Sequence, residues 1–362
     1  MTAPVPRPGV LEISPYVGGK SAVPGGTKPI KLSSNEGALG PSPKAVEAAR
    51  AAAADMHRYP DGGASALRKA IGTRFGLDPA RIVCGAGSDE LIALLVKAYA
   101  GPGDEVLYSQ YGFVMYPISA HAAGATPVTA PEKGYRTDID ALIARAGPKT
   151  KICFVANPNN PTGSYVTGAE LKRLRDGLPP HVLLIVDAAY AEYVSRNDYT
   201  NGAELVDAPG ANTVMLRTFS KIFAMGGMRL GWAYAPAAIV DVLDRVRGPF
   251  NVAAVAQAAG VAALEDLEFQ DRARAHNDRL LPWFAGECAR LGLETLPSVG
   301  NFLLVKFPKE GKTAAAANDF LMSRAIIPRM VANYGLPEFL RVTIGTEDEM
   351  KKVVAALEAF LK

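Results

Sequence analysis

A lysine, a neighbouring hydroxyl and an arginine lie close together in a glycine-punctuated segment of the chain. Lys221 follows Ser220, and Arg229 lies eight residues further on, shortly before Gly231. A lone lysine is by default a solvated surface charge, but a lysine amine can also form a Schiff base with an aldehyde cofactor. Arginine binds phosphate well, and glycines let the backbone approach a ligand closely. The segment therefore suggests a cofactor-binding amine, and three further features bear on this hypothesis.

The first feature is a glycine-rich turn at residues 85–90. It places Gly87, Ser88 and Asp89 between a short apolar strand and a stretch of helical periodicity that begins at Glu90. A helix N-terminus presents free N–H groups to an anion, and Ser88 is a good cap and phosphate ligand. An ordinary capped turn is the alternative. A dinucleotide-binding loop is disfavoured because Glu90 stands where the third glycine would be.

The other two features are polar groups that follow buried strands. Asn160 lies in the loop 157–163, where two Asn-Pro steps restrict the backbone and direct the amide outward. Asp187 ends the apolar run 182–186, and a carboxylate there is costly unless it is paired, for example with a protonated pyridine nitrogen. Tyr190 could reach a phenolate on the same ring. A plain turn and a helix-capping Asp are the alternatives, but all four features together are the parts that hold pyridoxal phosphate.

Short apolar strands alternate with helical segments and must position these groups. The expected strands cover residues 81–84, 105–108, 126–129, 151–155, 182–186, 213–216 and 230–234. This pattern predicts an α/β fold with a mostly parallel central sheet covered by helices on both faces. A long helical segment at 253–290 could bridge two domains. Strands at 302–307, 326–328 and 339–344, with helices at 313–324 and 347–361, predict a smaller α+β domain.

The length and composition of the chain limit the number of domains and the classes of binding partner. A chain of 362 residues predicts about two domains. We expect an N-terminal arm over residues 1–40 that packs with the small domain, a large cofactor-binding domain over 41–250, and a small domain over 251–362 that includes the inter-domain helix. A net charge of +3 from 39 basic and 36 acidic residues is too balanced to favour nucleic acid or an anionic membrane.

Cysteine and histidine usage, together with the absence of long apolar runs, predicts a cytoplasmic protein without a metal site. The three cysteines are an odd number without a CxxC pair, which favours buried thiols in a reducing compartment. The four histidines are scattered and predict no metal cluster. No apolar run reaches about 18 residues, and the proline-rich N-terminus lacks a signal-peptide pattern.

The combined motifs resemble those of the fold-type-I, class II aminotransferases. Asn160-Pro161-Thr162-Gly163, Asp187 to Tyr190, and Ser220-Lys221 through Arg229 occur in the order and at the spacing of that family. Within it, residues 31–36, 40–43, 58–60, 87–90 and 340–346 are similar to the histidinol-phosphate aminotransferases. The resemblance covers nearly the whole chain and implies pyridoxal 5'-phosphate as the cofactor.

The resemblance also implies roles for individual residues. Lys221 would hold the cofactor and move the substrate proton, Asp187 would keep the pyridine nitrogen protonated, and Tyr111 would stack on the ring. Further cofactor contacts are expected from Gly87, Ser88, Asp89, Asn160, Tyr190, Ser220, Arg229 and Tyr59. Tyr190 is also expected to be catalytic, with Lys221 and Asp187. Tyr59 is expected to reach the active site of the partner subunit in a homodimer. The expected substrate-facing residues are Tyr16, Asn35, Tyr59, Arg329 and Arg341.

The implied reaction is transamination of L-histidinol phosphate with 2-oxoglutarate, which gives imidazole acetol phosphate and glutamate in histidine biosynthesis. An aromatic amino acid aminotransferase, or an enzyme that accepts both donors, is the runner-up. A threonine-phosphate decarboxylase is less favoured. A regulatory module with this fold is disfavoured because residues 1–40 are too short and too poor in basic helical sequence for a DNA-binding domain. The family's usual Thr-Tyr is replaced by residues 110–113 here, a departure that bears on substrate preference more than on reaction type.

Overall fold

A seven-stranded sheet forms the centre of the molecule in the computed structural model, which describes residues 4–22 and 28–362. The strand order is β2-β10-β9-β8-β7-β3-β4. All neighbouring strands are parallel except β10, which is antiparallel to both β2 and β9. The strands are β2 (Ile82–Gly85), β3 (Glu105–Ser109), β4 (Thr126–Ala130), β7 (Thr150–Ala156), β8 (Leu183–Asp187), β9 (Thr213–Thr218) and β10 (Gly231–Tyr234). The predicted mostly parallel sheet is confirmed.

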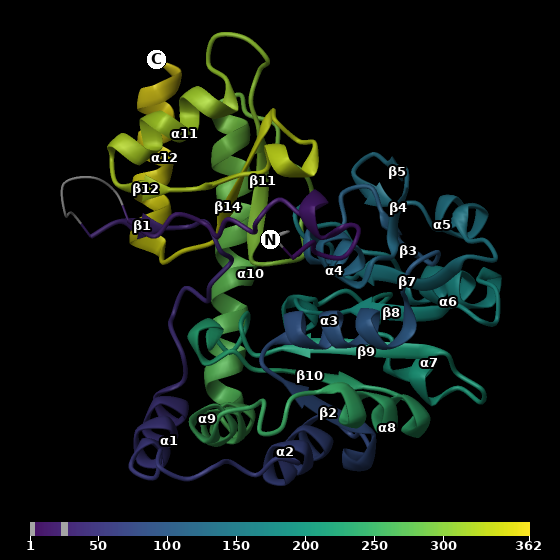
Figure 1. The fold of residues 1–362 in the computed structure, drawn as a ribbon. Helices are drawn as coiled ribbons and strands as arrows, with labels where there is room; N and C mark the ends of the chain where they lie inside the picture. The colour runs from purple at the N-terminus through teal and green to yellow at the C-terminus, as the bar shows by residue number, and fades with distance from the viewer. Residues whose placement is uncertain (1–3, 23–27) are drawn as a thin grey trace.

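Helices cover both faces of this sheet, so consecutive strand residues enter different apolar clusters (Figure 1). Phe154 packs with the helices of one face, whereas Cys153 and Val155 pack with those of the other. The first face carries α3 (Ser88–Tyr99), α4 (Met115–Ala123) and α8 (Ala237–Val246). The second face carries α1 (Pro43–Ala53), α2 (Ser65–Phe75), α5 (Ile139–Arg145), α6 (Gly168–Gly177), α7 (Ala203–Asp207) and α9 (Ala254–Glu265). This two-sided burial explains the continuous apolar runs in the strands.

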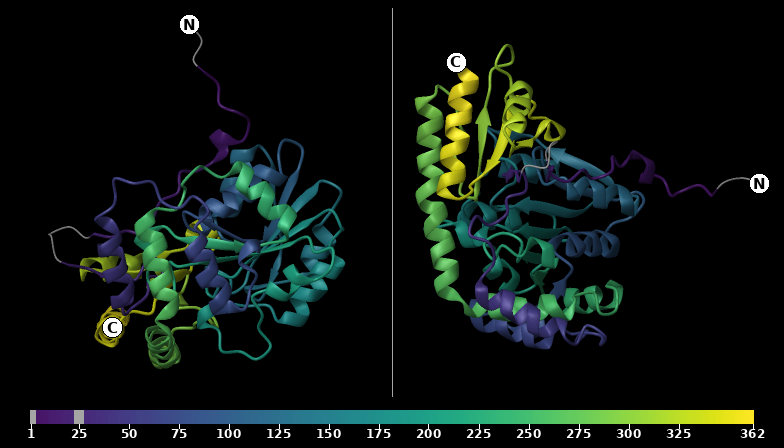
Figure 2. Two further views of the ribbon diagram at one scale, coloured as in Figure 1. Left: turned by 90° about the horizontal axis from the view of Figure 1, so that it is seen from below. Right: turned by 90° about the vertical axis from the view of Figure 1, so that its left-hand side faces the viewer.

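A smaller α+β part is built on a three-stranded antiparallel sheet of order β11-β14-β13. Its elements are β11 (Phe302–Lys306), β13 (Arg329–Met330), β14 (Phe339–Thr343), α10 (Leu267–Arg290), α11 (Ala314–Ser323) and α12 (Glu347–Leu361). Near the N-terminus, β1 (Ile30–Lys31) pairs in parallel with β12 (Ile326–Ile327). The helix α10 runs along most of the height of the molecule and links the two parts (Figure 2). A short hairpin joins β5 (Glu132–Lys133) and β6 (Arg136–Thr137).

The helix predicted at 253–290 is divided into α9 and α10 at Asp266, so that prediction is wrong in this detail. The backbone of Asp266 leaves the helical region, and its carboxylate accepts a hydrogen bond from Ser42 and pairs with Lys44 Nζ at 3.3 Å. Because α9 packs against α1 and α2, it lies with the large sheet. We propose that the domain division expected at residue 250 is closer to Asp266. Residues 1–3 and 23–27 of the expected arm lie outside the described residues.

No helix among the described residues combines the length and apolar character needed to cross a bilayer. Several helices begin at a residue whose side chain caps the first turn. For example, α12 begins with a capping box between Thr346 and Glu349, in which each side chain bonds the other residue's backbone N–H.

Candidate active site

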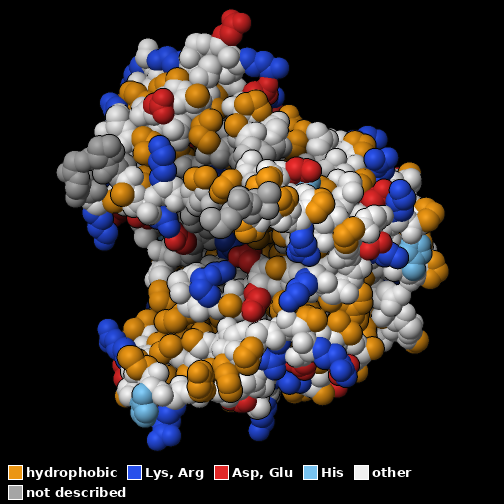
Figure 3. Space-filling view, in the orientation of Figure 1, with side chains coloured by type: hydrophobic (Ala, Val, Ile, Leu, Met, Phe, Trp, Pro, Cys, Tyr) orange, Lys and Arg blue, Asp and Glu red, His pale blue; other side chains and the backbone are white. Residues whose placement is uncertain are grey.

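A cavity of about 260 Å³ lies where β7, β8 and β9 end, and it also contacts the smaller part of the molecule. Ala156, Asp187 and Thr218 line it from the carboxyl ends of these strands. Parallel strands end at one edge of a sheet, and open α/β sheets bind ligands there. Arg329 and Arg341 line the cavity from β13 and β14. The space-filling view shows a hollow between the two parts, with charged side chains of both signs inside it (Figure 3).

The N-terminus of α3 and Arg229 form a cradle for an anion at one end of the cavity. Gly87 has a φ of 87°, and a Cβ there would collide with the guanidinium of Arg229. A Cβ at Gly231 would collide with the backbone nitrogen of Ser88, so both positions require glycine. No side chain caps α3, which leaves its first N–H groups directed at a ligand. Asp89 Oδ2 holds Arg229 Nη2 at 3.0 Å.

Ser220 and Thr218 complete this end of the cavity. Both line it, and the hydroxyl of Thr218 bonds the hydroxyl of Ser220 at 3.1 Å and accepts from the backbone N–H of Ser220. Arg229 Nη1 lies 3.5 Å from the Ser220 hydroxyl. The expected phosphate-binding residues are therefore grouped around one point.

Asp187 presents one unpaired carboxylate oxygen in the cavity wall. Its Oδ2 accepts a hydrogen bond of 2.9 Å from the hydroxyl of Tyr116, whereas its buried Oδ1 has no hydrogen-bond partner among the described residues. Burial raises the pKa of Asp187 to about 6, and the hydrogen bond from Tyr116 opposes this rise. A buried carboxylate oxygen without a donor is costly. A cationic N–H from a ligand would satisfy it.

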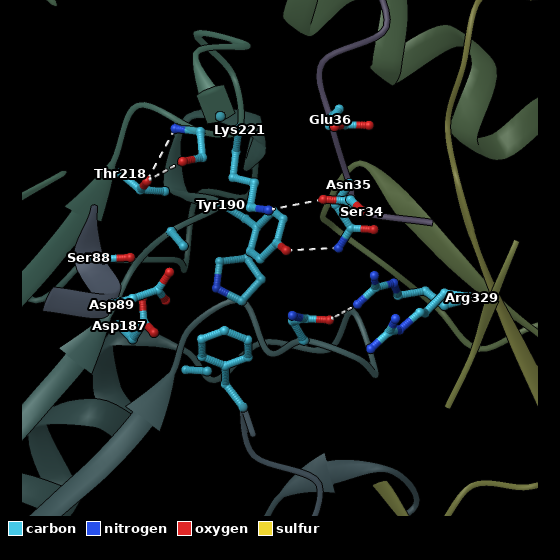
Figure 4. Close-up of a pocket in the computed structure, with 18 of the residues that line it drawn as sticks. Ser34, Asn35, Glu36, Ser88, Asp89, Asp187, Tyr190, Thr218, Lys221 and Arg329 are labelled. Carbon is cyan, nitrogen blue, oxygen red and sulfur yellow. Dashed lines mark hydrogen bonds between the residues drawn. The ribbon is translucent and has the colours of Figure 1, made fainter. Parts of the chain in front are cut away.

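The amine of Lys221 lies on the other side of the cavity. Its Nζ donates to the backbone oxygen of Ser34 at 3.3 Å and lies 5.5 Å from the ring centroid of Tyr190 (Figure 4). Burial, followed by the charge of Arg341, lowers the pKa of Lys221 to about 8. A lysine with this pKa is partly neutral near physiological pH, and a neutral amine is the nucleophilic and basic form.

A buried polar network surrounds this amine. The Asn35 amide donates to the Tyr190 hydroxyl at 2.8 Å. Arg341 Nη1 donates to Asn160 Oδ1, and its Nη2 donates to the backbone oxygen of Ser33 at 2.8 Å. Its Nε is buried without a partner among the described residues, and burial lowers the pKa of Arg341. The network brings the N-terminal segment, the loop after β7, and β14 together around the cavity.

Arg329 and Tyr16 lie at the mouth of the cavity. Arg329 lines the wall and donates from Nη2 to the backbone oxygen of Val17 at 2.9 Å, which holds the N-terminal segment across the opening. The Tyr16 side chain lines the cavity and is 57% exposed. All expected substrate-facing residues except Tyr59 therefore line this cavity.

The expectation for Tyr111 does not match the structure. Its ring stacks on Tyr135 at 5.8 Å, and Phe113, two residues later, lines the cavity instead. The cause is a tight turn in which the N–H of Gly112 donates to the Ser109 oxygen at 2.7 Å. This turn directs Tyr111 away from the strand ends. Within this chain, Phe113 is the aromatic side chain that stands where Tyr111 was expected.

Tyr59 also lies outside the cavity of its own chain. Its side chain is 83% exposed and stacks on Phe250 at 4.7 Å. Its expected contact with a partner subunit stays a prediction.

Several residues that shape the site have no recognisable pattern in the sequence. Phe113 and Tyr334 line the cavity, and Tyr116 bonds Asp187. Ser33 and Ser34 act through backbone oxygens, which carry no side-chain pattern. The aromatic spacing around residue 111 could have identified Phe113 only with knowledge of the turn.

The residues present fit the expected pyridoxal phosphate. The unpaired Asp187 Oδ1 suits a protonated ring nitrogen, and the uncapped α3 N-terminus with Arg229 suits a phosphate. Tyr190 and Asn160 provide polar groups for a ring oxygen, and Lys221 provides a buried amine. The cavity therefore contains a matching partner for each polar part of this group.

Comparisons with known proteins agree with this fit. The family model described as aminotransferase class I and II matches residues 27–357. The chain is 61% identical to a histidinol-phosphate aminotransferase from Paramagnetospirillum magneticum, over 100% of this chain and 99% of the relative. It is 60% identical to one from Rhodospirillum centenum, over 100% of both. The crystal structure of histidinol-phosphate aminotransferase from Sinorhizobium meliloti in complex with pyridoxal-5'-phosphate superposes with a TM-score of 0.86 at 30% identity, covering 92% and 90% of the two chains.

Proposed function

The chain belongs to the aminotransferase class I and II family, and on that premise we propose that it transfers the amino group of L-histidinol phosphate to 2-oxoglutarate. It is a pyridoxal-phosphate-dependent aminotransferase with the fold-type-I architecture. The products of the proposed reaction are imidazole acetol phosphate and glutamate, which places the enzyme in histidine biosynthesis. Full-length identity of 61% to a histidinol-phosphate aminotransferase is the observation that carries this proposal.

Arg329 and Arg341 favour a substrate that carries two negative charges on one terminal group. Burial lowers the pKa of Arg341, and the neighbouring charge of Arg329 lowers it further. Two guanidinium groups close enough to repel each other bind a dianion better than a monoanion. We propose that they bind the phosphate of histidinol phosphate in one half-reaction and a carboxylate of 2-oxoglutarate in the other.

The remaining cavity residues are assigned to the cofactor and to proton transfer. When bound, pyridoxal phosphate supplies a carbon that accepts the amino group and a ring that accepts electrons. Lys221 Nζ removes the proton from the substrate Cα and returns it, since its lowered pKa makes it a general base near neutral pH. Asp187 holds the proton on the ring nitrogen. The phosphate is held by Arg229, Ser220 and the first N–H groups of α3, among them those of Ser88 and Asp89.

The amino donor is tested by the half-reaction without an acceptor. We expect histidinol phosphate to exceed phenylalanine in kcat/KM by at least about 30-fold. The single carboxylate charge of phenylalanine would leave one of the two guanidinium groups uncompensated, and an uncompensated charge in such a site costs about 2–5 kcal/mol. Stopped-flow absorbance of the bound cofactor measures each donor separately. Arg329→Ala serves as a matched variant and is expected to slow histidinol phosphate more than phenylalanine. Equal rates for the two donors, or equal losses in the variant, would favour an enzyme that accepts both donors, and a faster reaction with phenylalanine would favour an aromatic amino acid aminotransferase.

A second copy of the chain is proposed as the partner of Tyr59. Tyr59, Phe250 and Met56 are exposed apolar side chains, with 83%, 44% and 80% of their surface accessible. Large exposed aromatic side chains that stack on each other are typical of interaction sites. We propose that this surface forms the homodimer contact and that Tyr59 reaches the partner's cavity.

Subunit complementation tests the crossing of Tyr59. Tyr59→Ala and Lys221→Ala each remove one group, and a heterodimer of the two variants would contain one intact site if Tyr59 crosses. Differently tagged, co-expressed subunits should therefore give a purified heterodimer with about half of the wild-type activity, as two-fold symmetry requires. A heterodimer no more active than the mean of the two homodimeric variants would show that Tyr59 serves its own chain or no site.

The three cysteines support the proposed cytoplasmic location. Cys84, Cys153 and Cys288 are free and buried, and burial raises the pKa of each thiol to about 12. Buried thiols of this kind are typical of reducing compartments.

A further inference from the structure

Tyr116 is buried directly behind the cavity wall. It is the second residue of α4, its side chain is 1% exposed, and its hydroxyl donates to Asp187 Oδ2 at 2.9 Å. The ring stacks nearly flat on Phe154, with centroids 4.3 Å apart and planes at 7°. A ring held in this way has little freedom, so the position of its hydroxyl is fixed.

The same ring also supports the aromatic side chain of the cavity wall. The edge of Tyr116 contacts Phe113, with centroids 5.9 Å apart and planes at 87°. Phe113 lines the cavity where the sequence had suggested Tyr111. Tyr116 therefore contacts both the carboxylate and the aromatic group that face the ligand space.

We propose that Tyr116 is a positioning residue that orients Asp187 and Phe113 together, so that Asp187 Oδ1 faces the cofactor ring nitrogen while Phe113 faces the ring plane. This inference rests on the proposed function and extends it to a residue that does not line the cavity. The hydrogen bond occupies Oδ2 and leaves Oδ1 as the free acceptor. Without it, the carboxylate could rotate and present neither oxygen in a defined direction.

The charge state of Asp187 depends on the same hydrogen bond. Burial raises the pKa of Asp187 to about 6 and Asp89 on α3 raises it further, whereas the Tyr116 hydroxyl, the backbone N–H of Ala189 and the charge of Lys221 lower it. Burial, then the neighbouring Asp187, raises the pKa of Tyr116 well above its usual value, so this hydroxyl stays a donor. Of the other groups near the carboxylate, Tyr190 and Tyr199 also have raised pKa values, chiefly through burial, and stay neutral.

Loss of the Tyr116 hydroxyl should therefore raise the pKa of Asp187. Below its pKa the carboxyl is protonated and no longer pairs with a cationic ring nitrogen. Cofactor binding by the empty protein should thus weaken as the pH falls through this value. In wild type we expect that midpoint near the pKa of about 6.

The experiment compares Tyr116→Phe with Tyr108→Phe and Asp187→Asn. Tyr108 is a buried tyrosine whose ring centroid lies 6.0 Å from that of Tyr116. The Tyr108→Phe variant therefore also removes one phenolic hydroxyl from the same apolar cluster, but leaves the hydrogen bond to Asp187 in place. Fluorescence titration of the empty proteins with pyridoxal phosphate between about pH 5 and 8 gives the dissociation constants. Tyr116→Phe should raise the midpoint by about one pH unit, which weakens binding about fivefold at the wild-type midpoint and about tenfold below it, since one pKa unit is a factor of ten. Tyr108→Phe should match wild type, and Asp187→Asn should bind weakly without a midpoint.

Either of two outcomes would overturn the proposal: a wild-type midpoint in Tyr116→Phe, or an equal shift in Tyr108→Phe. Thermal unfolding of the empty variants shows whether the fold is kept, as expected because phenylalanine retains the stacking on Phe154. In the assembled enzyme, Tyr116→Phe should lower kcat for histidinol phosphate and leave KM nearly unchanged. If the wild-type enzyme did not react with histidinol phosphate, only the proposed function would be contradicted. The proposal for Tyr116 would still stand or fall on the cofactor-binding titration, which does not depend on the amino donor.

Discussion

Replacement of Lys221 by alanine is expected to lower turnover by at least about 10⁴-fold, because the chain would lose both its covalent anchor and its general base. Lys221 is the amine placed in the cavity, with its Nζ 3.3 Å from the Ser34 oxygen and its pKa lowered to about 8 by burial. Single-turnover kinetics with histidinol phosphate measure the loss. Borohydride treatment followed by mass spectrometry should find no cofactor attached to the variant, whereas wild type should carry it on Lys221.

A lysine outside the cavity provides the control for this prediction. Lys306 pairs with Glu294 at 2.9 Å on the surface, and Lys306→Ala should keep wild-type turnover. A small primary amine added to Lys221→Ala should restore part of the proton transfer, since the missing group is a base. Turnover above about one hundredth of wild type in Lys221→Ala, without added amine, would contradict the assignment, because a general base alone contributes about 10²–10⁴-fold.

The grouping of the main polar residues could be predicted from the sequence because strand ends define it. Asn160, Asp187 and Lys221 each follow an apolar run that becomes a parallel strand, and all three line one cavity. The carboxyl ends of such strands share one edge, so the order of motifs along the chain translates directly into proximity. The roles assigned to these residues remain predictions for the experiments above.

Contacts between segments that are distant in the chain could not be predicted from the sequence. Tyr116 and Asp187 lie 71 residues apart, and their bond depends on how α4 packs against the sheet. The choice of Phe113 over Tyr111 depends on one tight turn, and both are aromatic. The helix is divided at Asp266, whose carboxylate accepts a hydrogen bond from Ser42, 224 residues away in the sequence. In each case tertiary contact overrides the local signal.

Replacement of Arg341 by methionine is expected to lower kcat/KM by about 10²–10³-fold in both half-reactions, because removing one partner of a buried charge pair costs about 2–5 kcal/mol. The guanidinium is buried, donates to Asn160 Oδ1 and to the Ser33 oxygen, and lies 5.5 Å from the ring centroid of Phe302. Methionine fills similar apolar space but leaves the substrate anion and both acceptors without a donor. Separate half-reactions with histidinol phosphate and with 2-oxoglutarate measure the two losses.

The comparison with Arg329 makes this prediction specific to the buried position. Arg329 lies at the mouth of the cavity with a bond to the Val17 oxygen, so Arg329→Met should cost less than Arg341→Met in each half-reaction. A surface charge is already solvated, whereas the Arg341 guanidinium is buried and its Nε has no hydrogen-bond partner among the described residues, so its charge is compensated less well without an anion. If Arg341→Met kept the wild-type rate with 2-oxoglutarate, Arg341 could not be the shared anion site. The two substrates would then bind through different arginines, and the specificity of the enzyme would have to arise at the mouth.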